Sequence, residues 1–194
     1  MIILASTSPA RQAMLANAGV TFTAQSPAVD ERNLTAENPQ WLPGEISARL
    51  AEAKALDVSH RNLHALVIGA DQVLILGDRI YSKPRDVEDC RRQLRELRGQ
   101  PHRLISSVVC ARNGSVSWRF TDVAVLTMRD FSGEFIDMYL AANTANCMTS
   151  VGGYQIEGLG LQLFSSIAGD YFTILGLPLL PLLHHLRLEN ELPS

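Results

Sequence analysis

Residues 64–84, HALVIGADQVLILGDRIYSKP, decide the fold that we predict for this chain. The run from 65 to 70 is continuously apolar, which is typical of a strand buried on both faces. We expect this strand to end at Asp71. The residues behind it, VLIL-GD-RIYS, carry a Gly-Asp pair between two apolar runs and predict a tight hairpin. The stretch therefore predicts a buried strand with a carboxylate at its end and a hairpin directly after it.

The N-terminal side of this stretch predicts a strand, a helix, a second strand and a second helix. The first helix has its N-cap at Ser8, proline at position 9 and glycine at position 19, just past its end. The expected elements are a strand over 1–4, the capped helix, a strand over 20–27, a polar loop over 33–44 and a helix over 44–58. In the last helix we expect apolar positions at helical spacing, with Lys54 beside them: Ile46, Leu50, Ala53 and Leu56.

The C-terminal side mixes hairpins and helices. A helix over 86–97 is capped by Asp86, with four side chains facing inward: Val87, Cys90, Leu94 and Leu97. A long antiparallel hairpin turns at Asn113-Gly114. We further expect a helix over 132–142 and a glycine-rich loop over 149–164 that leads into a strand. Residues 169–188 predict a loop and then a proline-started helix. The fold class is therefore α/β with a mixed twisted sheet and flanking helices, in one domain over 1–194 with two lobes.

Composition excludes several classes of function. The chain has 194 residues, of which 46% are hydrophobic and 19% are charged, with a net charge of −3. Such a field disfavours nucleic acid and acidic membranes as partners, and no segment has the apolar length of a membrane span. Three widely spaced cysteines fit reduced thiols, so we expect cytoplasmic residence. A homodimer is expected only because it is the commonest soluble assembly.

Lysine is rare in this chain. Of the 17 lysines and arginines, only Lys54 and Lys83 are lysine. A bias toward arginine codons explains the scarcity, and under such a bias a surviving lysine marks a place where a compact ammonium is needed. The scarcity of lysine therefore singles out these two positions before any motif is considered.

Each candidate site residue has a structural and a functional interpretation. Ser8 begins a helix whose free N–H groups can bind phosphate, and such an anion would offset the unfavourable position of the Arg11 charge in the first turn. Alternatively, Ser8 is a plain helix cap and Arg11 faces solvent. Asp71 fits metal coordination or general-base chemistry, or it caps a turn. Lys83 fits phosphate binding or a plain surface position. The loop with Glu157 could approach a nucleobase or serve only the fold.

Together these segments resemble the Maf-like nucleoside triphosphate pyrophosphatases. The resemblance is carried by LASTSPARQAML, Val29-Asp30-Glu31, ARLAEAKA, GADQVLILGDRIYSKP and YQIEGLG with IAGDYFTILGLPL, in this order over nearly the whole chain. It implies an elongated α/β fold like that of the inosine-triphosphate pyrophosphatases, with a cleft between two lobes. It also implies hydrolysis of nucleoside triphosphates to monophosphate and pyrophosphate with Mg²⁺ or Mn²⁺, which removes modified nucleotides and is linked to cell-division arrest.

The resemblance assigns roles to individual residues. Asp71 is the implied catalytic residue and, with Glu31, a metal ligand. The implied substrate-binding residues are Ser8, Arg11, Lys54, Lys83, Gln72 and Glu157. Both lysines of the chain thus fall on implied functional positions.

The pair Asp71-Gln72, with Glu157 before Gly158, is similar to the branch acting on 7-methyl-GTP rather than to the thymidine- and uridine-preferring branch. The chain departs from the family at Ala10, at Ser82 and at Ser150-Val151, where a lysine is absent. These changes make the expected cleft less positive. An alternative from another class is a nucleotide-sensing regulator of cell division that acts through a protein partner.

Overall fold

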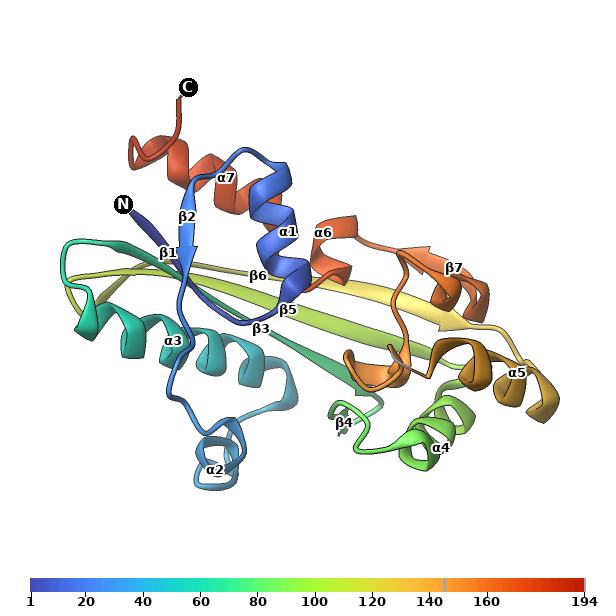
Figure 1. Ribbon diagram of the computed structural model, residues 1–194. Helices are drawn as coiled ribbons and strands as arrows, with labels where there is room; N and C mark the ends of the chain where they lie inside the picture. The colour runs from blue at the N-terminus through green and yellow to red at the C-terminus, as the bar shows by residue number, and fades with distance from the viewer. Residues whose placement is uncertain (145, 194) are drawn as a thin grey trace. The chain divides into compact units, whose positions relative to one another are not determined.

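The computed structural model describes residues 1–144 and 146–193, in which helices alternate with the strands of one sheet (Figure 1). The strands are β1 (Ile2–Ala5), β2 (Phe22–Ala24), β3 (Leu66–Leu76), β4 (Arg79–Tyr81), β5 (Pro101–Arg112), β6 (Ser115–Met128) and β7 (Phe164–Ala168). The helices are α1 (Pro9–Asn17), α2 (Glu31–Ala36), α3 (Pro43–Arg61), α4 (Val87–Leu97), α5 (Gly133–Asn143), α6 (Tyr171–Ile174) and α7 (Leu179–Leu188), with short 3₁₀ turns η1 (Val151–Gly153) and η2 (Leu159–Leu163).

The sheet is mixed, as the sequence predicts. Its order is β2-β1-β3-β5-β6-β7, and β4 pairs with β3 off this path. β1 runs parallel to β2 and to β3, whereas β3–β4 and β6–β7 are antiparallel. The carboxyl end of β1 lies opposite Gly69 within β3, and the carboxyl ends of parallel strands are where α/β sheets commonly bind ligands.

The described residues divide into two compact units. The first unit holds residues 1–72, 105–123 and those from 170 onward, and the second holds 73–104 and 124–169. This division agrees with the prediction of two lobes, while the elongated shape and the cleft stay predictions.

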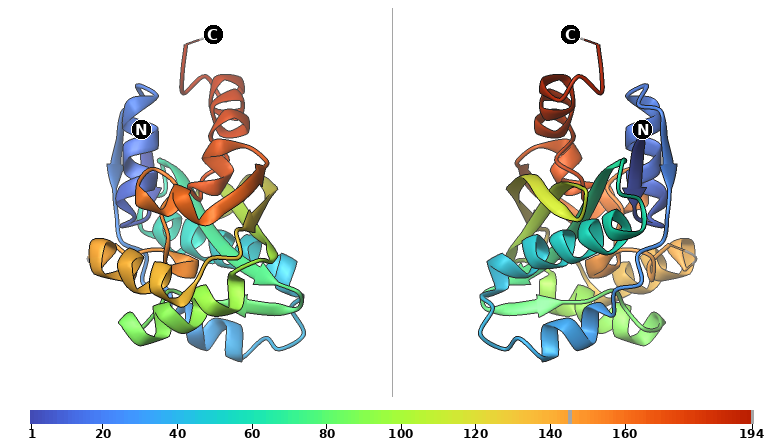
Figure 2. Two further views of the ribbon diagram at one scale, coloured as in Figure 1. Left: turned by 90° about the vertical axis from the view of Figure 1, so that its right-hand side faces the viewer. Right: turned by 90° about the vertical axis from the view of Figure 1, so that its left-hand side faces the viewer.

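In the first unit, alternate residues of β1 and β3 face two different helical layers. One face packs with α1 and α7 in a single apolar cluster, to which the strands contribute Ile2, Leu4, Leu66, Ile68 and Ala70. The opposite face packs with Val58 of α3, and there the strands contribute Ile3, Ala5 and Val67. Figures 1 and 2 show α1 and α7 on the side of the sheet away from α3, near both chain ends. Because side chains alternate along a strand, the α3 face also receives positions 69 and 71 of β3.

β3 differs from the prediction at Asp71. The strand does not end there but continues through Asp71 to Leu76. The apolar run 73–76 extends it, so it pairs directly with β4 in the predicted hairpin. Its parallel neighbour β1 ends opposite Gly69, where Ala5 is the last partner. Asp71 therefore lies just beyond the end of β1, where it is buried although no β1 residue is paired with it.

Two further expectations were wrong in part. Residues 33–36, expected in a loop, belong to α2, because Asp30 caps it by accepting from the amide of Asn33. In α3 the buried stripe is rotated from Ala53 and Leu56 toward Ala51, Lys54, Ala55 and Val58. The helix therefore presents its lysine to the sheet rather than beside the apolar stripe.

The short helix α6 lies in a stretch that the sequence predicts as a loop, whereas the long hairpin and α4 agree with the sequence. The turn between β5 and β6 has left-handed Asn113 and Gly114, with φ of 52° and 72°, as the predicted hairpin requires. In the second unit, α4 is capped by Asp86 and packs on α5 and on η1. No helix of residues 1–144 and 146–193 is long and apolar enough to cross a membrane.

Candidate active site

Lys54 joins two carboxylates in the first unit. Its Nζ lies 2.6 Å from Asp71 Oδ1 and 2.6 Å from Glu31 Oε1. The side chains of Lys54 and Asp71 are each only 8% exposed, whereas that of Glu31 is half exposed. Buried charges of this kind require partners, so the ammonium and the two acids form one cluster that is open on the Glu31 side.

A glycine fixes the position of Lys54. A Cβ added at Gly69 would lie 2.3 Å from the carbonyl oxygen of Ala51 and 2.7 Å from the amide nitrogen of Ala55. Only glycine lets the α3 backbone lie this close to β3. Since Lys54 lies on the same helix face and Asp71 lies two residues after Gly69 on the same strand face, the close contact brings the two charges together.

Arg11 supplies the second cation of this cluster. It lies in the first turn of α1, and its Nε donates to the carbonyl of Gly176 at 2.8 Å. Burial lowers the pKa of the guanidinium, and the carboxylates of Asp71 and Glu31 oppose this shift. Both acids therefore act electrostatically on Arg11, which stays charged at any physiological pH.

Burial also shifts the carboxyl of Asp71. It raises the pKa of Asp71 above the ordinary value, while Lys54 and Arg11 act in the opposite direction. A buried carboxylate whose negative charge depends on two cations is suited to accept a proton or to bind a metal ion. The geometry thus gives Asp71 the electrostatic setting of a general base.

Ser8 is the N-cap of α1, as predicted. Its Oγ accepts from the amide of Arg11 at 3.5 Å, and its own amide donates to Ser6 Oγ at 3.1 Å. The Ser6 carbonyl in turn accepts from Gln12 at 3.4 Å. The serine turn is therefore held by its own hydrogen bonds at the end of β1, and phosphate binding by Ser8 stays a prediction.

Gln72, Lys83 and Glu157 are the other predicted site residues. Gln72 belongs to the first unit, where its Nε2 donates to Ser106 Oγ and to the carbonyls of Thr173 and Ile174 at 2.9–3.0 Å. Its amide nitrogen is thus fully used within the fold. Lys83 and Glu157 are exposed residues of the second unit. The substrate-binding roles of all three stay predictions.

The family can now be named, because a family model described as Maf-like protein matches residues 1–189. This chain belongs to the Maf-like family. A relative from Brucella abortus, named 7-methyl-GTP pyrophosphatase, is 50% identical over 193 residues, covering 97% of this chain and 96% of its own. One from Mesorhizobium japonicum with the same name is 52% identical over 188 residues, with coverages of 96% and 94%.

A third relative and one solved structure are also similar to this chain. A protein from Rhodopseudomonas palustris, named nucleoside triphosphate pyrophosphatase, is 49% identical over 191 residues and covers 98% of this Maf-like chain and 95% of its own. Among solved structures, the Staphylococcus aureus Ham1 protein matches with a TM-score of 0.37 and 14% identity, over 66% of this chain and 72% of its own. That score is too low to carry an argument.

The two carboxylates of this Maf-like protein fit a divalent cation. Glu31 and Asp71 converge on a single positive group at 2.6 Å each. No group of three or more His, Cys, Asp or Glu side chains within 1–144 and 146–193 could hold a metal alone. Mg²⁺ is typically held by one or two protein carboxylates together with water and substrate phosphates. The pair therefore suits a cation that arrives with a polyphosphate, not one held by protein alone.

Sequence reasoning missed the partners that hold these side chains. The carbonyls of Thr173, Ile174 and Gly176 bind Gln72 and Arg11, and Thr173 itself donates to Asp122 at 2.7 Å. These residues follow Asp170, the N-cap of the short α6. The only signal was the resemblance in the segment GDYFTILGLP, because no spacing rule links position 11 to position 176.

Proposed function

We propose that this Maf-like protein hydrolyses nucleoside triphosphates to the monophosphate and pyrophosphate. The observation that carries the proposal is Lys54 bridging Asp71 and Glu31 with Arg11 in electrostatic reach. The names of relatives at about 50% identity support the same reaction.

The charge balance of this cluster explains how it would take a polyphosphate. Two cations and two carboxylates cancel, so the cluster is neutral as it stands. A divalent cation bound by Glu31 and Asp71 would supply Lewis-acid charge for the phosphate oxygens. Lys54, no longer needed by the two acids, would then be available with Arg11 to bind the triphosphate.

Asp71 has the central chemical role in this proposal. Water attacks the α-phosphorus, the bond from that phosphorus to the bridging oxygen breaks, and pyrophosphate leaves with the bonding electron pair. The proton of the water passes to the Asp71 carboxylate. If a divalent cation is bound, Asp71 would help Glu31 to hold it. Arg11 and Lys54 offset the negative charge that develops on the leaving group.

For the nucleobase we propose a 7-methylguanine-type purine. A carboxylate at Glu157 can accept from guanine N1–H and N2–H, and it favours the positive charge of a methylated ring. The names of two relatives, from Brucella abortus and Mesorhizobium japonicum, support this choice. The amide of Gln72 would contribute only through its oxygen, since its nitrogen already has three acceptors.

A substrate panel tests the proposal. Pyrophosphate and monophosphate are measured for GTP, 7-methyl-GTP, dTTP and UTP, each with Mg²⁺ and with Mn²⁺. We expect equal amounts of both products, with 7-methyl-GTP turned over best. Release of inorganic phosphate alone, or no hydrolysis, would refute the reaction, whereas preference for dTTP or UTP would refute only the base assignment.

The other expectations about partners stay predictions. A homodimer and cytoplasmic residence rest on general priors. The alternative of a division regulator has no observation in its favour among the described residues or in the names of the relatives, so it is not proposed.

A further inference from the structure

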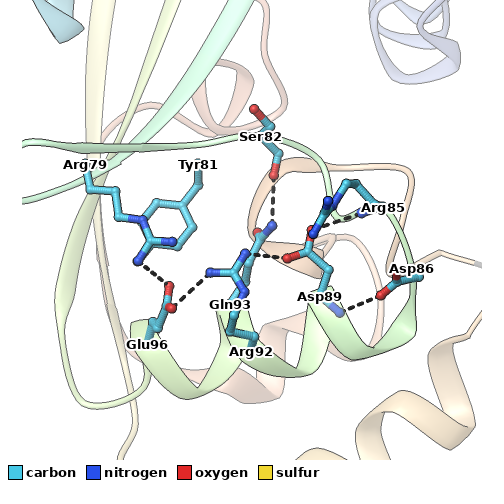
Figure 3. A network of polar contacts seen from close by, with 9 residues as sticks. All are labelled: Arg79, Tyr81, Ser82, Arg85, Asp86, Asp89, Arg92, Gln93 and Glu96. Carbon is cyan, nitrogen blue, oxygen red and sulfur yellow. Dashed lines mark hydrogen bonds and ion pairs between the residues drawn. The ribbon is translucent and has the colours of Figure 1, made fainter.

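Lys83 lies in a short link, residues 82–86, that joins β4 to α4 in the second unit. Two side chains of α4 reach back to this link on either side of the lysine (Figure 3). Gln93 Nε2 donates to the carbonyl of Ser82 at 3.1 Å, and Asp89 Oδ2 accepts from the amide of Arg85 at 3.1 Å. The backbone is therefore held at the residue before Lys83 and again two residues after it.

The helix start reinforces the same link. Asp86 Oδ1 accepts from the amide of Asp89 at 2.7 Å, which fixes the last residue of the link to the first turn of α4. Pro84 is buried, whereas Lys83 is exposed and makes no ion pair with any residue of 1–144 or 146–193. The link thus presents a free ammonium on a backbone that has little freedom.

The burial of Gln93 has a cost in stability, which indicates that this side chain serves a purpose beyond stability. Asp89 is 7% exposed and Gln93 is 3% exposed, on the helix face where only apolar side chains were expected. Burying a carboxylate or an amide is unfavourable unless its polar atoms find partners. Gln93 Oε1 is buried with no hydrogen-bond partner among the described residues. An apolar residue of similar size would pack there without this penalty.

The remaining contacts of α4 include Asp89 but not Gln93, whose one side-chain hydrogen bond among the described residues is the one to Ser82. Arg92 pairs with Asp89 and, at 3.0 Å, with Glu96. Glu96 also accepts from Tyr81 at 2.9 Å and pairs with Arg79 at 3.0 Å. These contacts stabilise the helix surface and β4. Only Asp89 and Gln93 bind the backbone on both sides of Lys83.

We propose that Asp89 and Gln93 are positioning residues, which hold the link so that Lys83 meets the phosphates of the substrate. This inference rests on the proposed function and on the further prediction, made from the sequence, that Lys83 binds the triphosphate of that substrate. It adds two residues that act through Lys83 and do not themselves touch substrate.

Hydrogen exchange tests the clamp without any substrate. Gln93→Met keeps the size of the side chain and removes its donor, and Asp89→Asn weakens the second contact. Losing a hydrogen bond of ordinary net strength should speed amide exchange in the peptide 82–86 about fivefold. The control Glu88→Gln changes an exposed residue of α4 that bonds only to Arg91, and it should leave the exchange unchanged. Exchange at the wild-type rate in both clamp variants would overturn the proposal.

Kinetics test the link to catalysis through a double-mutant cycle. In the otherwise wild-type protein, Gln93→Met should raise KM about fivefold, with kcat nearly unchanged and an equal or higher melting temperature. In a Lys83→Ala background the same change should alter KM less than twofold, since its target is gone. A purely structural role would instead lower the melting temperature and act equally in both backgrounds.

The outcomes separate this inference from the proposed function. An equal effect of Gln93→Met in both backgrounds overturns the positioning role and leaves the pyrophosphatase intact. No effect of Lys83→Ala on either constant removes Lys83 from the site and overturns the inference with it. If the wild type releases pyrophosphate from no nucleotide, the proposed function fails, and the exchange experiment still decides whether the clamp exists.

Discussion

Replacing Gly69 with alanine tests how the fold builds the charged cluster. The new Cβ would lie 2.3 Å from the Ala51 carbonyl oxygen, against the 3.4 Å at which ordinary contact begins, so α3 must retreat by about 1 Å. Lys54 lies on the retreating helix. Its 2.6 Å contact with Asp71 would lengthen beyond hydrogen-bonding range.

The expected size of the effect follows from this displacement. Overpacking of a tight contact typically costs about 1–3 kcal/mol, which in a chain of this length lowers the melting temperature by roughly 2–12 °C. A misplacement of about 1 Å in a catalytic group can reduce turnover by about 10²-fold. We therefore expect a folded, moderately destabilised protein whose kcat falls far more than its stability suggests.

The assay combines thermal unfolding with pyrophosphate release at saturating nucleotide. Gly44→Ala is the matched control, because it lies in the same helix and its Cβ would meet only Ile105 at an ordinary 3.7 Å. That variant should keep wild-type turnover and stability. If Gly69→Ala also kept both, the contact between α3 and β3 would not be what positions Lys54.

Three other changes have defined outcomes. Glu157→Gln should shift the preference away from 7-methyl-GTP by about tenfold in kcat/KM relative to UTP, and an unchanged ratio in the substrate panel would remove Glu157 from base recognition. Lys54→Met removes the ammonium that pairs with Glu31 and Asp71. Calorimetric titration without nucleotide should therefore show that this variant binds Mn²⁺ at least about threefold more tightly than the wild type. Weaker binding than in the wild type would mean that Lys54 orients the two acids for the metal. Burial lowers the pKa of His102 to about 4 from an ordinary 6.5. As the pH falls, the unfolded chain therefore binds a proton at this histidine before the folded chain does. The free energy of unfolding should then decrease by about 3 kcal/mol between pH 6.5 and pH 4. In acid unfolding curves, His102→Gln should lose less stability over this pH range than the wild type, whereas His184→Gln, which changes an exposed histidine, should behave as the wild type. Identical acid unfolding of His102→Gln and the wild type would show that His102 does not cause the loss.

The sequence predicts the layers of this fold well, because strand and helix patterns depend on local burial. The apolar run before Asp71, the turn at Asn113-Gly114 and the caps at Ser8 and Asp86 all occur as expected. Their signals are short-range, so one sequence suffices to find them.

The errors arise where tertiary contacts override local pattern. Lys54 is buried in the stripe of α3 because Gly69 admits the helix closely and Asp71 neutralises the charge, and neither fact can be read from the helix itself. Asp89 and Gln93 have the same origin, since their partners lie in the preceding link. A polar residue at a buried helical position is thus the signal that local patterns miss.

The sequence predicts which residues belong to the candidate site but not how their side chains are arranged. Both lysines had been singled out by their rarity, and the structure brings one of them, Lys54, together with Arg11, Glu31 and Asp71. The carbonyl of Gly176, which holds Arg11, is 165 residues away along the chain. No pattern within one sequence relates positions so far apart.

Asp71 is central to the proposed reaction because it activates or orients the water that attacks the α-phosphorus. The most direct test of this role is pyrophosphate release from 7-methyl-GTP by Asp71→Asn, beside Glu52→Gln, which alters only an acid of α3 paired with Arg119. We predict that Asp71→Asn folds and still binds nucleotide but turns over about 10³-fold more slowly or worse, while Glu52→Gln matches the wild type. A folded Asp71→Asn variant with wild-type turnover would contradict the account.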